Sequence, residues 1–429
     1  MASPTTDTAP QPLPPSPSAL TIALAGAISL ACALGLGRFA FTPLLPLMVQ
    51  DGLVDLRFGS WLATLNYIGY LLGALSCMAL PFVLHKRSTQ QLRQLTLPLL
   101  RGGLIGTTLL LFVMALPLPS LWALARTVAG IVSAWVFVYT TAWCLEQLAV
   151  RQANQLGGLI YAGPGIGIAV SGLLVSKMAL WQAHAQLIWA VIGTAAIALS
   201  AFVWHITARV HRHEQRQAPA SAPQAAPIAS SALQRRTIHW SSEQVLLAIA
   251  YGFAGFGYII TATYLPVIAR TVMPGSPWIA LFWPIFGLAV AVGAASTRFI
   301  APWRDRRTLL ILSYLLQALG VVLPLWLPNS IGFILGSILL GLPFTALTLF
   351  AVQEVRRLLP EHAAPFIGAI TTLYGIGQIA GPPMVVWILG RASSQQQGFA
   401  LALSVAAATL VIGAALFLFL RLRYPIRTT

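Results

Sequence analysis

Twelve long apolar runs constrain the fold of this chain more than any other feature of its sequence. A helix that crosses the hydrocarbon core of a bilayer needs about 20 mostly apolar residues, because each residue adds about 1.5 Å along the helix axis. Pro-rich junctions at 116–119 and 327–329 separate runs that would otherwise merge. The sequence therefore predicts an all-α integral membrane protein with twelve transmembrane helices. The predicted helices cover about 20–49, 58–84, 97–117, 120–147, 156–178, 184–208, 243–271, 277–301, 307–327, 330–355, 363–390 and 397–421.

Charged residues are too few to cover a water-facing surface. They make up 8% of the 429 residues, whereas about 25% is usual in soluble domains. This excludes a soluble enzyme and a disordered scaffold. The net charge of +16 would indicate nucleic-acid binding in a soluble protein, but in a membrane protein it needs an explanation from topology.

The basic residues are distributed unevenly between the two sides of the predicted membrane. If the N-terminus is cytoplasmic, nineteen of the 25 Lys and Arg residues fall in cytoplasmic segments, four fall outside, and Arg38 and Arg126 fall within spans. The positive-inside rule then places both termini in the cytoplasm and removes the nucleic-acid interpretation. Arg outnumbers Lys 23 to two in an Ala-rich chain, which is typical of a GC-rich bacterial genome, so we expect the bacterial cytoplasmic (inner) membrane.

The apolar runs divide into two groups of six. We expect a disordered cytoplasmic N-terminal tail over 1–18, because this segment is rich in Pro and Ser/Thr and lacks the basic start of a signal peptide. A six-helix bundle over 19–208 follows, then a linker over 209–242 of Ala, Pro and Ser composition. A second bundle over 243–422 and a cytoplasmic tail over 423–429 complete the chain.

The His and Cys residues predict no metal site, cofactor or disulfide framework. His211 and His213 lie in the basic linker, where histidines are usually solvated. Cys32, Cys77 and Cys144 lie in apolar runs, where cysteine packs as a small hydrophobic residue.

The two groups of six runs repeat one another. A shift of 220 residues superposes Gly, Pro and Arg positions in and after the first two helices of each half, and a shift of 210 does so in the fifth. Two parallel six-helix repeats joined by a linker are an architecture of secondary transporters, whose substrate site lies between the halves near the membrane midplane. The matched pairs include Gly35 and Gly255, Gly37 and Gly257, Pro46 and Pro266, Gly73 and Gly293, Arg87 and Arg307, Gly158 and Gly368, Gly165 and Gly375, and Gly167 and Gly377.

Four motifs carry a resemblance to a known family. They are GRFAFTPLLPLM at 37–48, LNYIGYLLGA at 65–74, SAWVFV at 133–138 and YAGPG at 161–165. From about Ala19 onward the chain resembles the major facilitator superfamily, and in particular its YbfB/YjiJ-type branch. The resemblance implies the major facilitator fold but names no substrate.

Two wider signatures of the superfamily match in part. Arg126 and Gly130 match the Arg and Gly of its fourth-helix motif. The loop after the second helix normally carries an Asp followed by basic residues, but here residues 85–87 are only His, Lys and Arg. The counterpart loop at 304–307 keeps Asp305.

Arg38 and Arg126 are the charged residues that topology does not explain. A charge near the bilayer centre costs about 3 kcal/mol even on lenient insertion scales, so it normally faces a cavity or a partner. No Asp or Glu lies in the middle of any predicted span. A guanidinium binds a carboxylate through two parallel hydrogen bonds, so we interpret this pair as anchors for an anionic substrate. The alternative is that each Arg hydrogen-bonds backbone carbonyls or extends toward the membrane surface.

Other polar residues on the predicted helix faces complete a candidate substrate site. The second helix presents Asn66 and Tyr70 among glycines, a face that could equally serve close helix packing. Tyr258 occupies the repeat position of Arg38, and the eleventh helix carries a polar stripe. The predicted substrate-binding residues are Arg38, Asn66, Tyr70, Arg126, Tyr258, Tyr374 and Gln378.

Charged residues at the cytoplasmic helix ends suggest a gate. Glu146 and Glu354 end the fourth and tenth helices, and Arg87 and Arg307 follow the second and eighth. This symmetric placement predicts ion pairs, within or between the halves, that form when the inner gate shuts. The alternative is solvated helix ends, where ion pairs contribute little.

These features together predict a secondary active transporter that works by alternating access on a small organic anion. We expect a monomer in a lipid bilayer, a small-molecule carboxylate substrate, and protons as a candidate coupling ion. An exporter of hydrophobic or amphiphilic compounds and a non-transporting membrane sensor are the alternatives. An integral-membrane enzyme is disfavoured because the seven His residues are dispersed, and no phosphate-binding loop for ATP is present.

Overall fold

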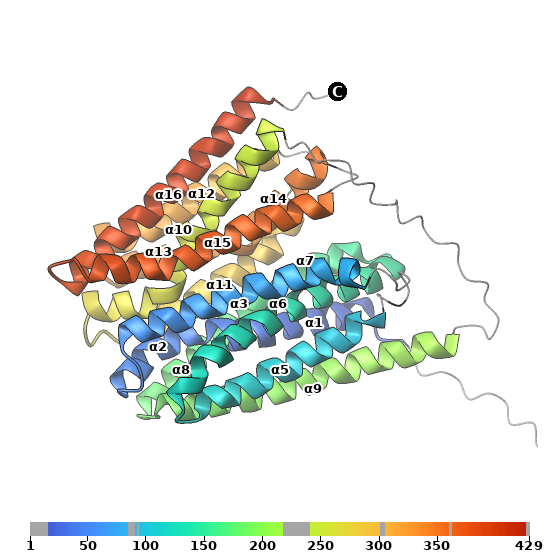
Figure 1. Ribbon diagram of the computed structural model, residues 1–429, viewed down its shortest axis with the longest axis horizontal. Coiled ribbons are helices and arrows are strands. Elements are labelled where there is room, and N and C mark those ends of the chain that lie inside the picture. The colour runs from blue at the N-terminus through green and yellow to red at the C-terminus, as the bar shows by residue number, and fades with distance from the viewer. Residues whose placement is uncertain are drawn as a thin grey trace, which may run out of the picture.

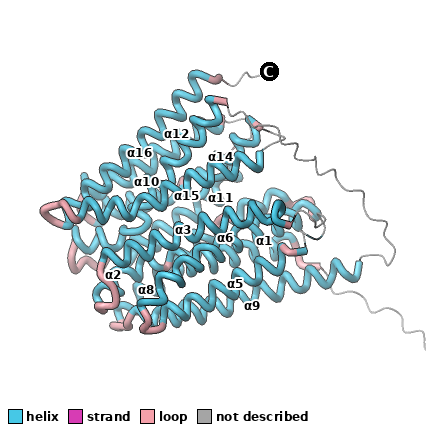
Figure 2. The backbone as a smooth tube through the Cα atoms, in the orientation of Figure 1, coloured by secondary structure: helices cyan, strands magenta, loops and turns pink. Residues whose placement is uncertain are grey.

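The computed structural model describes residues 16–84, 91, 94–217, 241–300, 305–359 and 363–425. Within this part, twelve helices are long and apolar enough to cross a membrane. They lie side by side in one layered bundle, and the described chain is helical between short turns (Figures 1 and 2). The predicted fold class and the predicted order of twelve membrane helices are confirmed.

The first six membrane helices occupy the N-terminal half of the chain. The first is built from α1 (Ala19–Leu30), η1 (Ala31–Phe39) and α2 (Phe41–Gln50). The next three are α3 (Leu56–Val83), α5 (Thr96–Ala115) and α6 (Pro119–Val150). The fifth joins η2 (Asn154–Leu156), α7 (Gly157–Ile160) and α8 (Gly163–Leu180), and the sixth is α9 (Ala185–Gln217).

The last six membrane helices follow the predicted linker. They are α10 (Ser242–Val272), α11 (Ile279–Ser296) with the short η3 (Thr297–Phe299), and α12 (Arg306–Trp326). The tenth membrane helix is split into α13 (Ser330–Gly341) and α14 (Phe344–Leu358), and α15 (Ala363–Leu389) and α16 (Gln395–Arg423) complete the set.

Polar side chains set several of the helix starts. Asp55, Asn329 and Ser394 each accept a hydrogen bond from a backbone N–H of the first turn, which is the usual role of an N-cap residue. Ser241 and Gln244 form a reciprocal capping box at the start of α10. These residues define helix boundaries that hydropathy alone places only to within a few positions.

Helix α9 continues nine residues past the predicted end at 208, to Gln217. Residues 209–217 contain good helix formers such as Arg, Glu and Gln, and Glu214 accepts a hydrogen bond of 2.7 Å from Gln147. The first part of the predicted linker is therefore helical. Its remaining residues to 240, and most of the predicted N-terminal and C-terminal tails, lie outside the described residues.

Three membrane helices are interrupted, the first and the tenth near their middles and the fifth near its start. The first passes through the π-helical segment η1, the fifth breaks between α7 and α8 ahead of Pro164, and the tenth breaks at Leu342 and Pro343. Proline lacks the N–H that would continue a helix, and π-helical turns are frequent at functional sites. The interruption in η1 is the one that carries Arg38.

The two groups of six helices pack mainly within themselves and meet mainly along two pairs of helices, with a smaller contact between α2 and α10. Helix α8 lies against α11, and α3 lies against α15. Helices α8 and α11 approach closely at Gly165, where a Cβ atom would lie only 2.4 Å from the backbone nitrogen of Ala291. Small residues allow such backbone contact between membrane helices.

Polar contacts join the two halves near one end of the bundle. At the end opposite the start of α1 and the end of α16, the Thr42 hydroxyl donates to the Ala262 carbonyl at 2.8 Å and the Ser176 hydroxyl to the Ala280 carbonyl at 2.7 Å. Figure 1 shows the two halves splaying apart toward the other end, where α1 begins and α16 ends. We call this the termini end.

Candidate functional site

Arg38 lies at the contact between the two halves. Its side chain is only 4% exposed, and its Nη2 donates a hydrogen bond of 3.0 Å to Oε1 of Gln378 on α15. The guanidinium carbon lies 4.2 Å from the ring centroid of Tyr70 and 5.0 Å from that of Tyr67. Aromatic ring faces stabilise a cation that is shielded from water. The Arg38 guanidinium is therefore held between helices of both halves.

Gln378 extends this contact to a third helix. Its Nε2 donates to the hydroxyl of Tyr258 on α10, while its Oε1 accepts from Arg38. Gln378 is 3% and Tyr258 1% exposed. The first, eleventh and seventh membrane helices are therefore linked by a buried hydrogen-bonded chain, with Arg38 supplied by one half and both partners by the other.

Only one of the two donor nitrogens on one edge of the Arg38 guanidinium has a hydrogen-bond acceptor. Nε has no hydrogen-bond partner among the described residues and is shielded from solvent. Nε and Nη2 lie on the same edge, and this edge can bind both oxygens of a carboxylate in parallel. The Gln378 amide oxygen fills one of the two acceptor positions. None of the acidic residues that the structure describes forms an ion pair with Arg38.

Arg126 contacts the backbone that carries Arg38. Its Nη1 and Nη2 donate to the carbonyls of Gly37 and Arg38 at 3.3 and 3.4 Å, and its guanidinium lies 4.4 Å from the Phe41 ring centroid. Pro43 has no N–H and would be the donor to the Arg38 carbonyl in the π-helical register. The contacts of Arg126 are those of the backbone-binding alternative.

Asn66 lies in the interface between α3 and α6. Its Nδ2 donates to the Arg126 carbonyl at 2.9 Å, and its Oδ1 has no hydrogen-bond partner among the described residues. A Cβ on Gly130 would lie 2.2 Å from the Asn66 carbonyl oxygen, so this face of α3 serves close helix packing. Tyr70, one turn further on, contacts Arg38 instead.

Aromatic rings of the second half extend from Gln378 toward the termini end. Tyr374 stacks on Tyr258 at 5.7 Å and on Tyr251 at 4.9 Å between ring centroids. Phe344, just after the break in the tenth membrane helix, meets Tyr258 edge-on at 4.9 Å. The structure thus brings the predicted residues Tyr258, Tyr374 and Gln378 together with Arg38 and Tyr70.

Three aromatic residues at this site were not among the substrate-binding residues predicted from the sequence. Tyr67 precedes Tyr70 by one turn, and its hydroxyl shares a hydrogen bond of 2.9 Å with the Thr263 hydroxyl. Tyr251 precedes Tyr258 by two turns, which puts both on one helix face. This spacing was a usable signal, whereas the position of Phe344 depends on the break in its helix.

A cluster of charges lies at the termini end of the second half. Glu354 is fully buried and accepts from Arg307 Nε at 2.5 Å and from Arg357 Nε at 2.9 Å. Arg307 also donates to Glu243 and to the carbonyls of Leu420 and Tyr424. Arg307 and Glu354, two of the four predicted gate residues, thus pair with each other inside one half, and the cluster ties the ends of α10, α12, α14 and α16 together.

The predicted counterpart in the first half differs. Glu146 lies on α6 and is exposed, unlike the buried Glu354. Arg87 lies outside the described residues. No group of three or more His, Cys, Asp or Glu side chains suited to a metal ion is found in the described parts of the chain.

Twelve membrane helices in two groups of six, which meet at a buried polar site, define a membrane transporter of the major facilitator fold. A family model described as "Uncharacterised MFS-type transporter YbfB" matches residues 30–418, and the chain belongs to this family. A sequence comparison with curated proteins finds no match.

Two solved structures of the nucleoside transporter NupG are similar in fold. A point mutant of NupG aligns with a TM-score of 0.68 at 12% identity, covering 93% of this chain and 99% of the other. A second NupG structure aligns with a TM-score of 0.64 at 12% identity, covering 94% and 98%. At this identity the likeness establishes the fold and not the substrate.

Proposed function

We propose that the protein is a secondary active transporter that carries a small organic anion with a carboxylate group by alternating access. One observation carries this proposal: the buried Nε–Nη2 edge of Arg38 is half vacant and has no acidic partner among the described residues. A buried charge is normally neutralised by a partner. A substrate carboxylate would supply that partner at the contact between the halves.

The geometry suggests how binding would be coupled to movement. Arg38 belongs to the first half, and Gln378 and Tyr258 belong to the second. A carboxylate that takes both positions on the Arg38 edge displaces the Gln378 amide oxygen and breaks the direct link between halves. Substrate binding thus exchanges one hydrogen bond between the halves for an ion pair that neutralises the buried charge of Arg38.

We place the termini end in the cytoplasm on the distribution of basic residues, nineteen to four. The ribbons of the two halves diverge toward this end (Figure 1), so we propose it as the end at which the halves separate when substrate enters from the cytoplasm. The polar contacts of Thr42 and Ser176 at the opposite end would form the closed outer gate. The bacterial inner membrane and a monomeric unit remain part of this proposal.

The remaining site residues take separate roles in this scheme. Tyr70 faces the Arg38 guanidinium, and Tyr258, Tyr374 and Gln378 form the opposing side. Arg126 acts on the substrate through the backbone that carries Arg38, and Asn66 acts one step further away, through the Arg126 carbonyl to which it donates. Protons are a candidate coupling ion, carried on the substrate or at Glu146, Asp51 or Asp55.

The stacked tyrosines favour a second candidate substrate. NupG is described as a nucleoside transporter, and a planar base could stack on rings such as Tyr251 and Tyr374. Such a substrate would use the aromatic residues and leave the Arg38 edge unfilled unless it also carried an acid. Export of amphiphilic compounds and a non-transporting sensor role complete the set of candidate functions.

Thermal stability of the purified protein distinguishes these candidates. A ligand at 100 times its Kd stabilises the folded state by about 2.7 kcal/mol. We expect small carboxylates to raise the melting temperature, and their methyl esters, which lack the charge, to have no effect. Stabilisation by nucleosides or amphiphilic cations alone would overturn the carboxylate assignment. Gradient-driven flux in proteoliposomes would then separate a transporter from a sensor.

The variant Gln378→Glu should block substrate binding with its own introduced carboxylate. It places a carboxylate of nearly the same shape opposite Arg38, where it fills the vacant edge and competes with substrate. We expect a higher melting temperature and at least a roughly tenfold loss in carboxylate affinity, measured by thermal-shift titration. Gln378→Met, the uncharged control of similar size, should keep carboxylate binding. Wild-type affinity in Gln378→Glu would contradict the role of this edge.

A further inference from the structure

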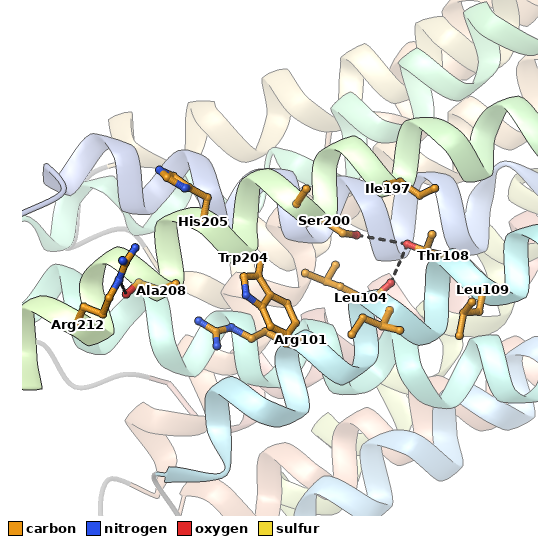
Figure 3. A pocket seen from close by; sticks show the side chains of 12 residues that line it. Arg101, Leu104, Thr108, Leu109, Ile197, Ser200, Trp204, His205, Ala208 and Arg212 are labelled. Carbon is orange, nitrogen blue, oxygen red and sulfur yellow. Dashed lines mark hydrogen bonds between the residues drawn. The ribbon is translucent and has the colours of Figure 1, made fainter.

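A groove on the outer face of the first half lies away from the central site. It encloses about 660 Å³ between α5 and α9, two helices that pack against each other and against α6 and α1 of their own half. Figure 3 shows its lining, which is drawn from α5 and α9 alone. The groove therefore opens toward the surrounding bilayer and not toward the contact between the halves.

The groove is basic at one end and apolar at the other. Arg101, His205 and Arg212 gather toward one end in Figure 3, and Leu109 and Ile197 lie toward the other. Arg101 follows the start of α5 and Arg212 precedes the end of α9, so the basic end is the termini end. Ile197 is 50% exposed and offers its side chain to an apolar ligand.

Arg101 is held in place but its charge is not balanced. Its Nε and Nη2 both donate to the Thr207 hydroxyl, at 3.1 and 2.9 Å, and its guanidinium lies 4.6 Å from the Trp204 ring centroid. Arg212 donates from Nε to the Ala208 carbonyl of its own helix at 3.3 Å. Neither Arg forms an ion pair with an acidic residue in the described chain.

The termini end of the last helix differs between the two halves. Helix α16 is the last of its half, as α9 is of the first, and its Arg421 pairs with Asp305 at 3.3 Å. An internal acid thus balances a cation at this end of α16. The groove between α5 and α9 has fixed cations without such an acid among the described residues, which suggests that an external anion completes it.

We propose that this groove binds one anionic phospholipid from the leaflet at the termini end. The phosphate group would lie against Arg101 and Arg212, and an acyl chain would follow Leu104, Ile105, Leu109 and Ile197. Basic residues beside a membrane helix attract anionic headgroups, and a groove open to the bilayer is supplied with lipid directly. A soluble phosphate would use the basic end but not the apolar one.

Native mass spectrometry of the full-length purified protein tests this proposal. The probes are phosphatidylglycerol, phosphatidylcholine with the same acyl chains, and glycerol phosphate as the headgroup alone. We expect one tightly retained phosphatidylglycerol, with roughly tenfold weaker binding of phosphatidylcholine and no retained glycerol phosphate. The double variant Arg101→Gln/Arg212→Gln should lose roughly tenfold to thirtyfold in phosphatidylglycerol affinity.

Three further variants make the result specific to the groove. Arg209→Gln removes the same charge from α9 outside the groove lining and should keep the bound lipid. Arg212→Gln alone leaves the Arg101–Thr207 contact intact, and should weaken binding even if the double variant fails to fold. Ala201→Phe fills the groove while both arginines stay, and should release the lipid. Equal retention of both lipids, or of phosphatidylglycerol by Ala201→Phe, overturns the proposal.

Discussion

Arg38→Ala is expected to abolish transport of a carboxylate substrate while the protein still inserts and folds. The variant removes the vacant guanidinium edge and leaves the Gln378 amide oxygen without its donor. Removing one member of a buried, hydrogen-bonded charge pair costs about 2–5 kcal/mol in binding. This corresponds to a loss of about 30-fold to 5,000-fold in substrate affinity. Uptake into proteoliposomes and thermal-shift titration measure the two effects separately.

The stability of the empty protein gives this experiment a second readout. Arg38 has no acidic partner among the described residues, so its removal takes an unbalanced charge out of the core. We expect the melting temperature of Arg38→Ala without substrate to equal or exceed that of the wild type. A purely structural Arg would instead give a destabilised protein.

Two matched variants control for the loss of charge. Arg38→Lys keeps the charge but cannot present two parallel donors, so it should bind carboxylates with intermediate affinity. Arg391→Ala removes an Arg that lies in the turn after α15 and donates to the Trp387 carbonyl of that helix at 3.4 Å, and should transport normally. Normal transport by Arg38→Ala would remove the anchor role altogether.

Hydropathy, together with the Pro-rich junctions at 116–119 and 327–329, was sufficient to predict the membrane helices. Their number follows from the length that a bilayer requires, and this requirement does not depend on how helices pack. The interruptions could not be predicted in the same way. The π-helical register of η1 accompanies a tertiary approach, since a Cβ on Gly35 would lie 2.4 Å from the Cα of Gly167.

The site was predicted in part for a similar reason. Periodicity assigns residues such as Arg38 and Gln378 to faces of their own helices, but it does not say which faces of two halves meet. The sequence could therefore suggest opposing linings, while their direct hydrogen bond came from the fold. Asn66 shares a face with Tyr70 in the sequence pattern, yet its side chain donates to the Arg126 carbonyl and not to a group at the contact between halves.

Glu354→Gln is expected to destabilise the second half of the chain strongly. Glu354 is fully buried and accepts hydrogen bonds from both Arg307 and Arg357. When Glu354 loses its charge, Glu243 is left to balance the guanidiniums of Arg307 and Arg357. The Arg307 side chain is only 2% exposed. Breaking a buried ion pair from one side costs about 3–5 kcal/mol, and the exposure of Arg357 lowers its share. The melting temperature in detergent should fall accordingly.

Glu146→Gln is the matched control in the first half. Its carboxylate is exposed on α6, where solvent screens charge interactions to about 1 kcal/mol or less. We expect a much smaller change in melting temperature than for Glu354→Gln. Equal effects of the two variants would show that burial of the Glu354 cluster does not matter.

The variant Glu354→Gln also tests the proposed gate. The cluster joins the ends of α10, α12, α14 and α16, so we propose that these ends move as one block when the halves rock. Loosening the block should change how often the termini end is open. A cysteine introduced as Gly158→Cys, beside Thr297 of the other half, reports this opening by its labelling rate once the three native cysteines are replaced. If Glu354→Gln leaves that rate unchanged while lowering stability, the cluster holds the second half together without taking part in gating.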